Sequence, residues 1–301
     1  MTLLTAGRRK IKRVIDELRG EDALRLRLVN ISHLLAGNFG NVALNLGAVA
    51  FTARALGPTH YGILALVMVF AQAIERLVSF QTWQPMIKYG AGLEEASRKN
   101  DLKALIKFVF LLDLATAVGG WCLAVFLATF GKQLFGWETG TLHLTLIYSL
   151  VLLFAINGAP VGILRLTGRF KTAAYVRLIA MVIRLALCAI AFFQGWSLFA
   201  YVIIWAATQA LGSILVMAAA ARELHQRDLL TFLAEPLGDV SARFSNIWRF
   251  SFLANISVTI RSTAQQFDTL LVGAMLDPAA AGFYHIAKRV AKFAQQAGAQ
   301  V

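Results

Sequence analysis

Polar and ionisable side chains recur at helical spacing inside long apolar stretches of this chain. Residues 29–53 carry asparagines three and four positions apart, and residues 250–276 carry arginine, glutamine and aspartate in a similar register. Because residues three, four and seven apart lie on one face of a helix, each set forms a polar seam. Other apolar stretches carry isolated charges. The candidate functional residues are Asn38, Asn41, Asn45, Gln72, Glu75, Arg76, Asp113, Arg184, Arg261, Gln265 and Asp268.

These seams have two interpretations, because a polar group inside a membrane is costly unless it has a partner, a cavity or a role. In the first, buried ion pairs, such as Glu75 with Arg76 or Asp113 with Arg184, fix the packing of the helices. In the second, the seams surround a water-filled cavity between helices. We favour the cavity for the whole set, because otherwise every polar seam would be buried without contact to water. The asparagine stripe alone is also consistent with contacts between helices.

The elements that carry these residues are predicted to be transmembrane helices. The chain is 58% hydrophobic and 15% charged, with a mean hydropathy of +0.65, whereas about a quarter of a soluble domain is charged. A span needs about 20 mostly apolar residues and must be helical, because lipid offers the backbone no hydrogen-bond partner. The fold class expected is an all-α polytopic transmembrane bundle. The predicted spans are 29–53, 63–83, 104–130, 142–164, 175–195, 197–221 and 250–276.

The positive charges predict an orientation. Lys and Arg concentrate in residues 1–28 and in every second segment between spans, whereas the opposite loops hold only Arg54 and Lys132. The positive-inside rule therefore predicts a cytoplasmic N-terminus. Residues 1–28 mix both charge signs and are predicted to form an amphipathic helix attracted to anionic lipid headgroups.

The longest polar gap between spans, residues 222–249, predicts a cytoplasmic linker between two lobes. The first lobe would be a six-helix unit over 29–221, and residues 250–301 would begin the second. An eighth helix starts near residue 279 and is cut by the chain end, so we expect a C-terminally truncated chain or a fragment. This helix carries Lys288, Arg289 and Lys292. It either lines a hydrated cavity or lies along the membrane surface.

A glycine and proline cluster interrupts the fourth span. Pro160 removes a helix hydrogen bond, so a kink is predicted there. Gly158 and Gly162 form a GxxxG pair, which favours tight helix packing and is also compatible with a hinge.

Other function classes lack support in the sequence. Cys122 and Cys188 lie in apolar spans and are predicted to be core residues, and the five histidines have no metal-ligand spacing. We expect no metal, no cofactor and no enzyme activity, because the phosphate-loop, HExxH and GxSxG motifs are absent. The net charge of +13 sits in short runs at helix ends, which argues against nucleic acid.

Two segments resemble one family. Residues 53–67, ARALGPTHYGILALV, resemble the LARxLGPxxYG segment of bacterial polysaccharide flippases, which belong to the multidrug/oligosaccharidyl-lipid/polysaccharide exporter superfamily. Gly57-Pro58 would end the first helix and Gly62 would open the next. Residues 267–290 resemble the family's segment in which an aspartate precedes a short turn and a G-[FY]-Y-x-x-A helix start. Asp268, Gly282, Tyr284 and Ala287 occupy those positions.

The resemblance implies a flippase of the bacterial inner membrane. It would move an undecaprenyl-pyrophosphate-linked oligosaccharide to the periplasmic leaflet for O-antigen, lipopolysaccharide or exopolysaccharide synthesis. Arg76, Arg184 and Arg261 would bind the diphosphate or line the cavity, and the asparagines with Gln265 would line it too. Glu75, Asp113 and Asp268 would couple an ion or pair those cations. The partners implied are the lipid-linked substrate, the bilayer, and a polysaccharide polymerase with its chain-length regulator.

Three alternatives remain open. A drug/cation antiporter of the same superfamily would favour an acidic and aromatic cavity. A membrane glycan polymerase or ligase would be expected to carry a large polar outer loop, and the outer loops here are short. A non-functional truncated remnant is the third.

Overall fold

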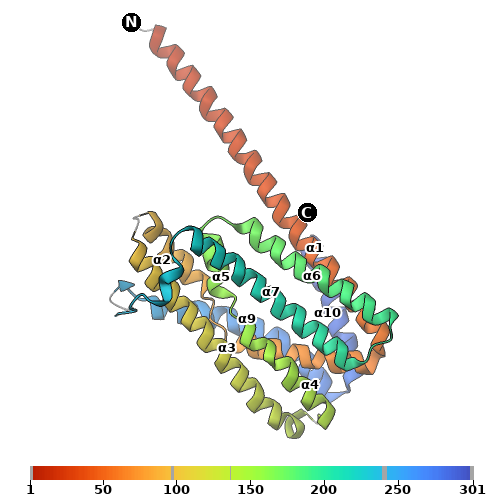
Figure 1. Ribbon diagram of the computed structural model, residues 1–301. Helices are drawn as coiled ribbons and strands as arrows, with labels where there is room; N and C mark the ends of the chain where they lie inside the picture. Colours follow the sequence, from red (N-terminus) through yellow and green to blue (C-terminus); the bar gives the residue numbers. More distant parts are fainter. Residues whose placement is uncertain (1–2, 96–97, 136, 239–242, 299–301) are drawn as a thin grey trace.

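The computed structural model describes the backbone of residues 3–95, 98–135, 137–238 and 243–298. Side chains are described for 40–93, 98–130, 137–238, 243–253, 267–292 and 294–295. Every regular element within these ranges is a helix, so the predicted all-α class is confirmed (Figure 1). The elements are α1 (Leu3–Val78), α2 (Trp83–Glu95), α3 (Lys99–Phe135), α4 (Thr139–Ser149), η1 (Leu150–Phe154), α5 (Gly158–Leu166), α6 (Phe170–Phe193), α7 (Leu198–Gln226), η2 (Leu230–Leu233), α9 (Ile247–Met275) and α10 (Pro278–Gly298).

Among the described residues, five helical stretches are long and apolar enough to cross a membrane. The predicted spans 29–53 and 63–83 overlap one of them, Gly40–Val78, on either side of a break in α1. The predicted span 250–276 coincides with α9, whose central side chains lie outside the described set, as do those of residues 1–28. The protein is therefore a multi-pass membrane protein. The five stretches are Gly40–Val78, Lys99–Phe130, Thr139–Leu166, Phe170–Phe193 and Leu198–Gln226.

The break in α1 lies at the predicted Gly57-Pro58 boundary. Gly57 has φ 69° and ψ 177°, a conformation that side chains other than glycine rarely adopt. Pro58 then starts the next helical turn, where its missing N–H costs nothing. The two arms of α1 therefore act as separate helices, and the second arm runs through the middle of the bundle (Figure 1).

The second arm of α1 packs tightly against the start of α10. A Cβ at Gly62 would overlap the Pro278 carbonyl group, and a Cβ at Gly282 would lie 3.0 Å from the Gly62 Cα. One residue away, the Tyr61 hydroxyl is 2.9 Å from His285 Nδ1. The two segments that resemble polysaccharide flippases thus form one interface, although more than 200 residues separate them in the chain.

The fourth predicted span is interrupted upstream of Pro160. The helix changes from α4 to the short η1 and stops at Phe154, and α5 restarts at Gly158. Pro160 lies in the first turn of α5, where a proline needs no N–H partner. The interruption therefore lies about one turn before Pro160, where a proline disturbs a helix. The break arises where η1 ends, and the proline helps to start the next helix.

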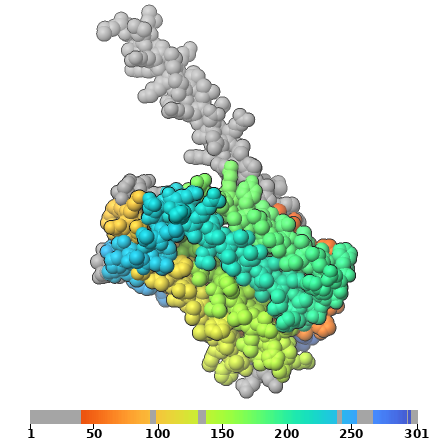
Figure 2. Space-filling model, in the orientation of Figure 1, coloured from red at the N-terminus to blue at the C-terminus, as the bar shows by residue number. Residues whose placement is uncertain are grey.

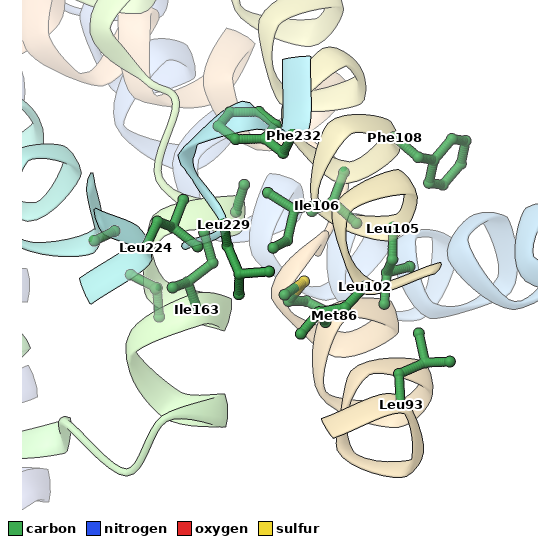
Figure 3. Close-up of a cluster of buried hydrophobic side chains, with 14 of the residues drawn as sticks. Met86, Leu93, Leu102, Leu105, Ile106, Phe108, Ile163, Leu224, Leu229 and Phe232 are labelled. Carbon is green, nitrogen blue, oxygen red and sulfur yellow. The ribbon is translucent and has the colours of Figure 1, made fainter. Parts of the chain in front are cut away.

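The GxxxG pair of α5 contacts α2 and the residues just before it. A Cβ at Gly162 would lie 2.8 Å from the Met86 Cβ, and one at Gly158 would overlap the Thr82 hydroxyl. This contact belongs to a cluster of buried apolar side chains contributed mainly by α2, α3, α5, α7 and η2 (Figure 3). Tight packing is thus the role that the structure supports for both glycines.

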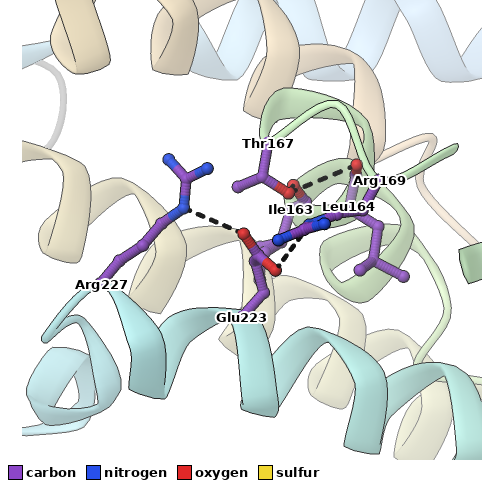
Figure 4. Close-up of polar contacts among 6 residues, drawn as sticks. All are labelled: Ile163, Leu164, Thr167, Arg169, Glu223 and Arg227. Atoms are coloured by element: carbon purple, nitrogen blue, oxygen red, sulfur yellow. Dashed lines mark hydrogen bonds and ion pairs between the residues drawn. The ribbon is translucent and has the colours of Figure 1, made fainter.

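A buried carboxylate ties the α5–α6 turn to α7 (Figure 4). Glu223 Oε2 accepts from Arg169 Nε at 3.2 Å, and Glu223 Oε1 accepts from Arg227 Nε at 3.1 Å. The Glu223 side chain is 9% exposed, whereas the Arg169 and Arg227 side chains are 57% and 37% exposed. One carboxylate therefore fixes the ends of three helices relative to each other.

The outer faces of several helices are apolar and exposed, as lipid-facing surfaces are. Figure 2 shows the side formed by α6 and α7, where Phe193, Phe199 and Ile203 are exposed. Cys188 is buried as predicted, but Cys122 is exposed on α3. The prediction of a core role for Cys122 is wrong, because hydropathy does not separate a lipid-facing position from a buried one.

Candidate functional site

A polar cavity lies between the helices, in two chambers that share several lining residues. The larger, here the Asp113 chamber, has a volume of about 690 Å³ and lies among α1, α3, α5, α6 and α7. The smaller, here the Arg289 chamber, has a volume of about 500 Å³ and is closed on one side by α10. Because the chambers share wall residues, we treat them as one continuous cavity. The shared residues are Asn41, Gln72, Arg76, Met181, Arg184 and Gln209.

The structure places most of the predicted residues on this cavity. Glu75 and Asp113 line the Asp113 chamber, and Asn45 lines the Arg289 chamber. The side chains of Asn38, Arg261 and Gln265 lie outside the described residues, so the structure does not place them. Asp268 lines neither chamber.

The cavity wall carries more positive than negative side chains. Its acids, among the described residues, are Glu75 and Asp113. Its cations come from α1, α5, α6 and α10. They are Arg76, Arg165, Arg177, Arg184, Lys288, Arg289 and Lys292. A wall with this balance favours an anionic ligand.

Asp113 does not pair with Arg184. Its carboxylate accepts from the Thr82 hydroxyl at 2.5 Å and from the Ala159 backbone N–H at 2.6 Å. It therefore caps the N-terminus of α5, where a negative charge is favourable. Thr82 lies in the break between α1 and α2, and Ala159 lies just after the break between η1 and α5. The Asp113 carboxylate therefore links α3 to both breaks. Asp113 and Arg184 therefore do not form the ion pair that the packing interpretation offered, because each side chain has partners of its own.

Asp113→Ala is expected to lower the free energy of unfolding by about 2–4 kcal/mol, because it leaves a buried hydroxyl and a helix N–H without an acceptor. The measurement is thermal unfolding of the purified protein in detergent. Asp101→Ala is the control, since Asp101 pairs with the exposed Arg98 and such pairs contribute about 0–1 kcal/mol. Equal effects of the two substitutions would contradict the capping role.

Two guanidinium groups share one indole ring in the Arg289 chamber. The Arg184 guanidinium carbon lies 4.7 Å from the centre of the Trp205 ring, and that of Arg289 lies 5.4 Å from it. Arg184 donates to Thr208 Oγ1 at 2.8 Å, and Arg289 donates to Asn45 Oδ1. Within the described part of the chain, neither arginine forms an ion pair with a carboxylate. Among the described side chains, this pair of cations therefore has no carboxylate counter-ion.

Asp268 lies on the α9–α10 contact. Its carboxylate accepts from Lys288 Nζ at 2.5 Å and from the Tyr284 hydroxyl at 2.9 Å. Tyr284 and Asp268 belong to the segment that resembles the flippase family, so this pair gives the second segment a structural role. The contact also holds α10 against α9, and Lys288 reaches both Asp268 and the wall of the Arg289 chamber.

Several cavity residues were not predicted from the sequence. Arg165 and Arg177 lie near helix ends and were counted with the cytoplasmic charges. His285, Lys288, Arg289 and Lys292 occupy positions i, i+3, i+4 and i+7, which lie on one face of α10. This spacing is the signal that could have assigned them to the cavity. Of the two interpretations of this helix, the structure supports the one in which it lines the cavity. Tyr148, Trp205, Thr208 and Gln209 also lie on its wall.

No group of His, Cys, Asp and Glu suited to a metal ion occurs among the described residues. Direct interactions available in the cavity are thus hydrogen bonding, cation–anion pairing and stacking on Trp205. Groups of this kind suit a polar anion.

Residues 28–298 match a family model described as polysaccharide biosynthesis protein. The chain belongs to this family. It is 27% identical over 271 residues to the inner membrane protein YghQ of Escherichia coli (strain K12), an alignment that covers 89% of this chain and 75% of that protein.

A solved structure titled as an inward-facing multidrug resistance MATE family transporter of the MOP superfamily is also similar. Its TM-score is 0.48 at 16% sequence identity, over 86% of this chain and 57% of that one. The chain thus spans little more than half the length of this solved transporter.

Family membership and the multi-pass helical bundle point to a membrane transporter linked to polysaccharide biosynthesis. The polar cavity between its helices is the candidate functional site.

Proposed function

We propose that this protein moves an undecaprenyl-pyrophosphate-linked oligosaccharide from the cytoplasmic to the periplasmic leaflet of the bacterial inner membrane. The product would serve O-antigen or exopolysaccharide synthesis. The diphosphate and the sugars of this substrate cannot enter hydrocarbon unaided, whereas its lipid tail can remain there. A hydrated cavity open to the polar part of the molecule resolves this conflict.

The observation that carries the proposal is the pair Arg184 and Arg289 on Trp205. Burying a cation without a counter-anion is costly, and Arg184 is only 5% exposed. A bound diphosphate would supply the missing charge, and its oxygens suit the fork of a guanidinium group. Arg76 lies on the same wall and would extend the cationic surface toward the Asp113 chamber.

The amide groups of the cavity suit the sugar part of the substrate. The Asn41 side-chain oxygen is buried, and no described group donates a hydrogen bond to it. Gln72 and Gln209 lie on the same shared wall. An unsatisfied acceptor of this kind is stabilised when a ligand hydroxyl donates to it.

The proposed cycle is alternating access between two lobes. Residues 29–221 would form the first lobe, 222–249 a cytoplasmic linker and 250–301 the start of the second, with the N-terminus in the cytoplasm. The polymerase and chain-length regulator would act on the flipped product. Asn38, Arg261 and Gln265 are proposed to contribute to the cavity from α1 and α9, with Glu75, Asp113 and Asp268 pairing its charges or coupling an ion.

A drug/cation antiporter is the second candidate in the same superfamily. The excess of cations on the cavity wall disfavours it, because a cationic drug would be repelled from both chambers. A glycan polymerase or ligase would need reacting groups at the wall, whereas the wall carries mainly groups that bind.

The decisive test uses a strain that lacks the gene. We expect lipid-diphosphate-linked oligosaccharide to accumulate as complete single repeat units, with loss of the surface polymer, and both can be quantified by mass spectrometry and gel analysis. A wild-type copy should restore both, and so should Arg222→Ala, which alters an exposed arginine on α7. An Arg184→Ala copy should restore neither.

An unchanged glycolipid pool together with unchanged polymer would contradict the flippase function. Increased susceptibility of the deletion strain to cationic drugs, without a change in the glycolipid, would instead favour the antiporter. A deletion without any phenotype would favour the remnant.

A further inference from the structure

His285 connects the two tightly packed segments of α1 and α10 to the arginine pair. The ring is 5% exposed and lines the Arg289 chamber. Its Nδ1 lies 2.9 Å from the Tyr61 hydroxyl oxygen, and its Nε2 accepts from Arg289 Nε at 3.2 Å. Both ring nitrogens therefore have hydrogen-bond partners. Nδ1 faces Tyr61, in the contact between α1 and α10, and Nε2 faces Arg289, a candidate substrate-binding residue.

These contacts define the protonation state of the empty site. A guanidinium nitrogen can only donate, so His285 Nε2 must be an unprotonated acceptor. The single ring proton then lies on Nδ1 and is donated to the Tyr61 oxygen. His285 is thus neutral when Arg289 occupies this position, and it holds the guanidinium beside Asn45 and Trp205.

The surroundings of His285 oppose a second ring proton while the cavity is empty. The titratable and charged groups that line the Arg289 chamber with it are phenolic or positive, and no described ion pair involves His285. The acids Glu75 and Asp113 lie on the other chamber, and Asp268 is engaged by Lys288 and Tyr284. The groups facing this part of the cavity are Tyr61 and Arg76 on α1, Tyr148 on α4, Arg184 on α6, and Lys288, Arg289 and Lys292 on α10.

We propose that His285 takes up a proton when a diphosphate binds to Arg184 and Arg289, so that loading of the anionic cargo is coupled to proton binding. Once protonated, His285 Nε2 no longer accepts from Arg289 Nε and instead donates to a phosphate oxygen of the bound anion. Arg289 keeps its terminal nitrogens for the same anion. The proton comes from the solution on the loading side and is released when the anion leaves. This coupling rests on the proposed diphosphate site.

The coupling predicts the direction in which diphosphate affinity changes with pH. An anion that favours protonation of His285 is itself bound more tightly when His285 is protonated, because linkage is reciprocal. Affinity for the diphosphate should therefore rise as the pH falls through the range in which histidine titrates, about pH 8 to 5. The limit for one coupled proton is about tenfold in affinity per pH unit.

The test measures proton uptake directly. Farnesyl diphosphate is titrated into the purified full chain in detergent by calorimetry, in two buffers of different ionisation enthalpy at about pH 7. Per bound ligand, wild type is expected to take up more protons than His285→Asn. The difference reaches about one proton if protonation of His285 is fully coupled to ligand binding. Ligand protonation is common to both proteins and cancels in the difference. His225→Asn, on an exposed position of α7, is the control and should behave as wild type.

The proton count separates this role from a structural one, because a variant that merely binds more weakly keeps the same uptake per bound ligand. Tyr61→Phe provides a second check. It removes the partner of Nδ1 but leaves Nε2, so uptake should persist. Binding with unchanged uptake in His285→Asn would overturn the coupling and leave the diphosphate site standing. Absence of binding to wild type would overturn both.

Discussion

Replacing Arg184 and Arg289 together by alanine is expected to lower the affinity for farnesyl diphosphate by at least about 100-fold, since each charge-assisted hydrogen bond contributes about 1.5–3 kcal/mol. Each single substitution should cost about tenfold or more. Both guanidinium groups face one indole and lack a carboxylate partner among the described residues. The measurement is calorimetric titration of the purified protein.

Two further variants sharpen this prediction. Arg184→Lys keeps the charge but loses the planar fork, so it should recover only part of the affinity. Arg222→Ala removes an exposed arginine outside the cavity and should leave the affinity unchanged. An equal loss in Arg222→Ala and Arg184→Ala would show that net charge, rather than the site on Trp205, attracts the anion.

Gly62→Ala is expected to lower the free energy of unfolding by about 3 kcal/mol, which is large for the addition of one methyl group. The new Cβ would overlap the backbone carbonyl of Pro278, which cannot rotate away as a side chain could. α10 would then have to move away from α1. Because α10 carries His285 and Arg289, diphosphate affinity should fall in the same variant.

Gly119→Ala is the matched control for this prediction. Gly119 lies on the exposed face of α3, and nothing lies within 4 Å of a Cβ built there. Alanine at an unobstructed helical position is expected to stabilise by about 0.5–1 kcal/mol. Thermal unfolding in detergent measures both variants. A Gly62→Ala protein as stable as Gly119→Ala would mean that the α1–α10 contact is looser than described.

Much of the fold follows from local properties of the chain. Hydropathy over about 20 residues depends on composition alone, so the all-α multi-pass class could be predicted directly. The break at Gly57-Pro58 was also predictable, because glycine permits a positive φ and proline prefers the start of a helix. The spacing of Asn41 and Asn45 indicated a polar seam, and that seam does face the cavity.

The partners of the charged side chains depend on the tertiary structure and could not be predicted from the spacing of residues in the sequence. An ion pair of Asp113 with Arg184 was one interpretation of the sequence, but the interruption between η1 and α5 presents a backbone N–H that binds the Asp113 carboxylate instead. Such a choice depends on the depth and rotation of separate helices, which periodicity within one helix does not determine. The same holds for Cys122, since a lipid-facing position and a buried one are equally apolar.

The cationic site on Trp205 depends on one long-range contact. Composition shows that residues 278–298 contain lysine and arginine, yet it allows that helix to lie either on the membrane surface or against the bundle. Gly62 and Gly282 let the two backbones approach closely, and this packing turns His285 and Arg289 toward Arg184. Steric fit between segments more than 200 residues apart therefore converts a basic helix into one wall of the cavity.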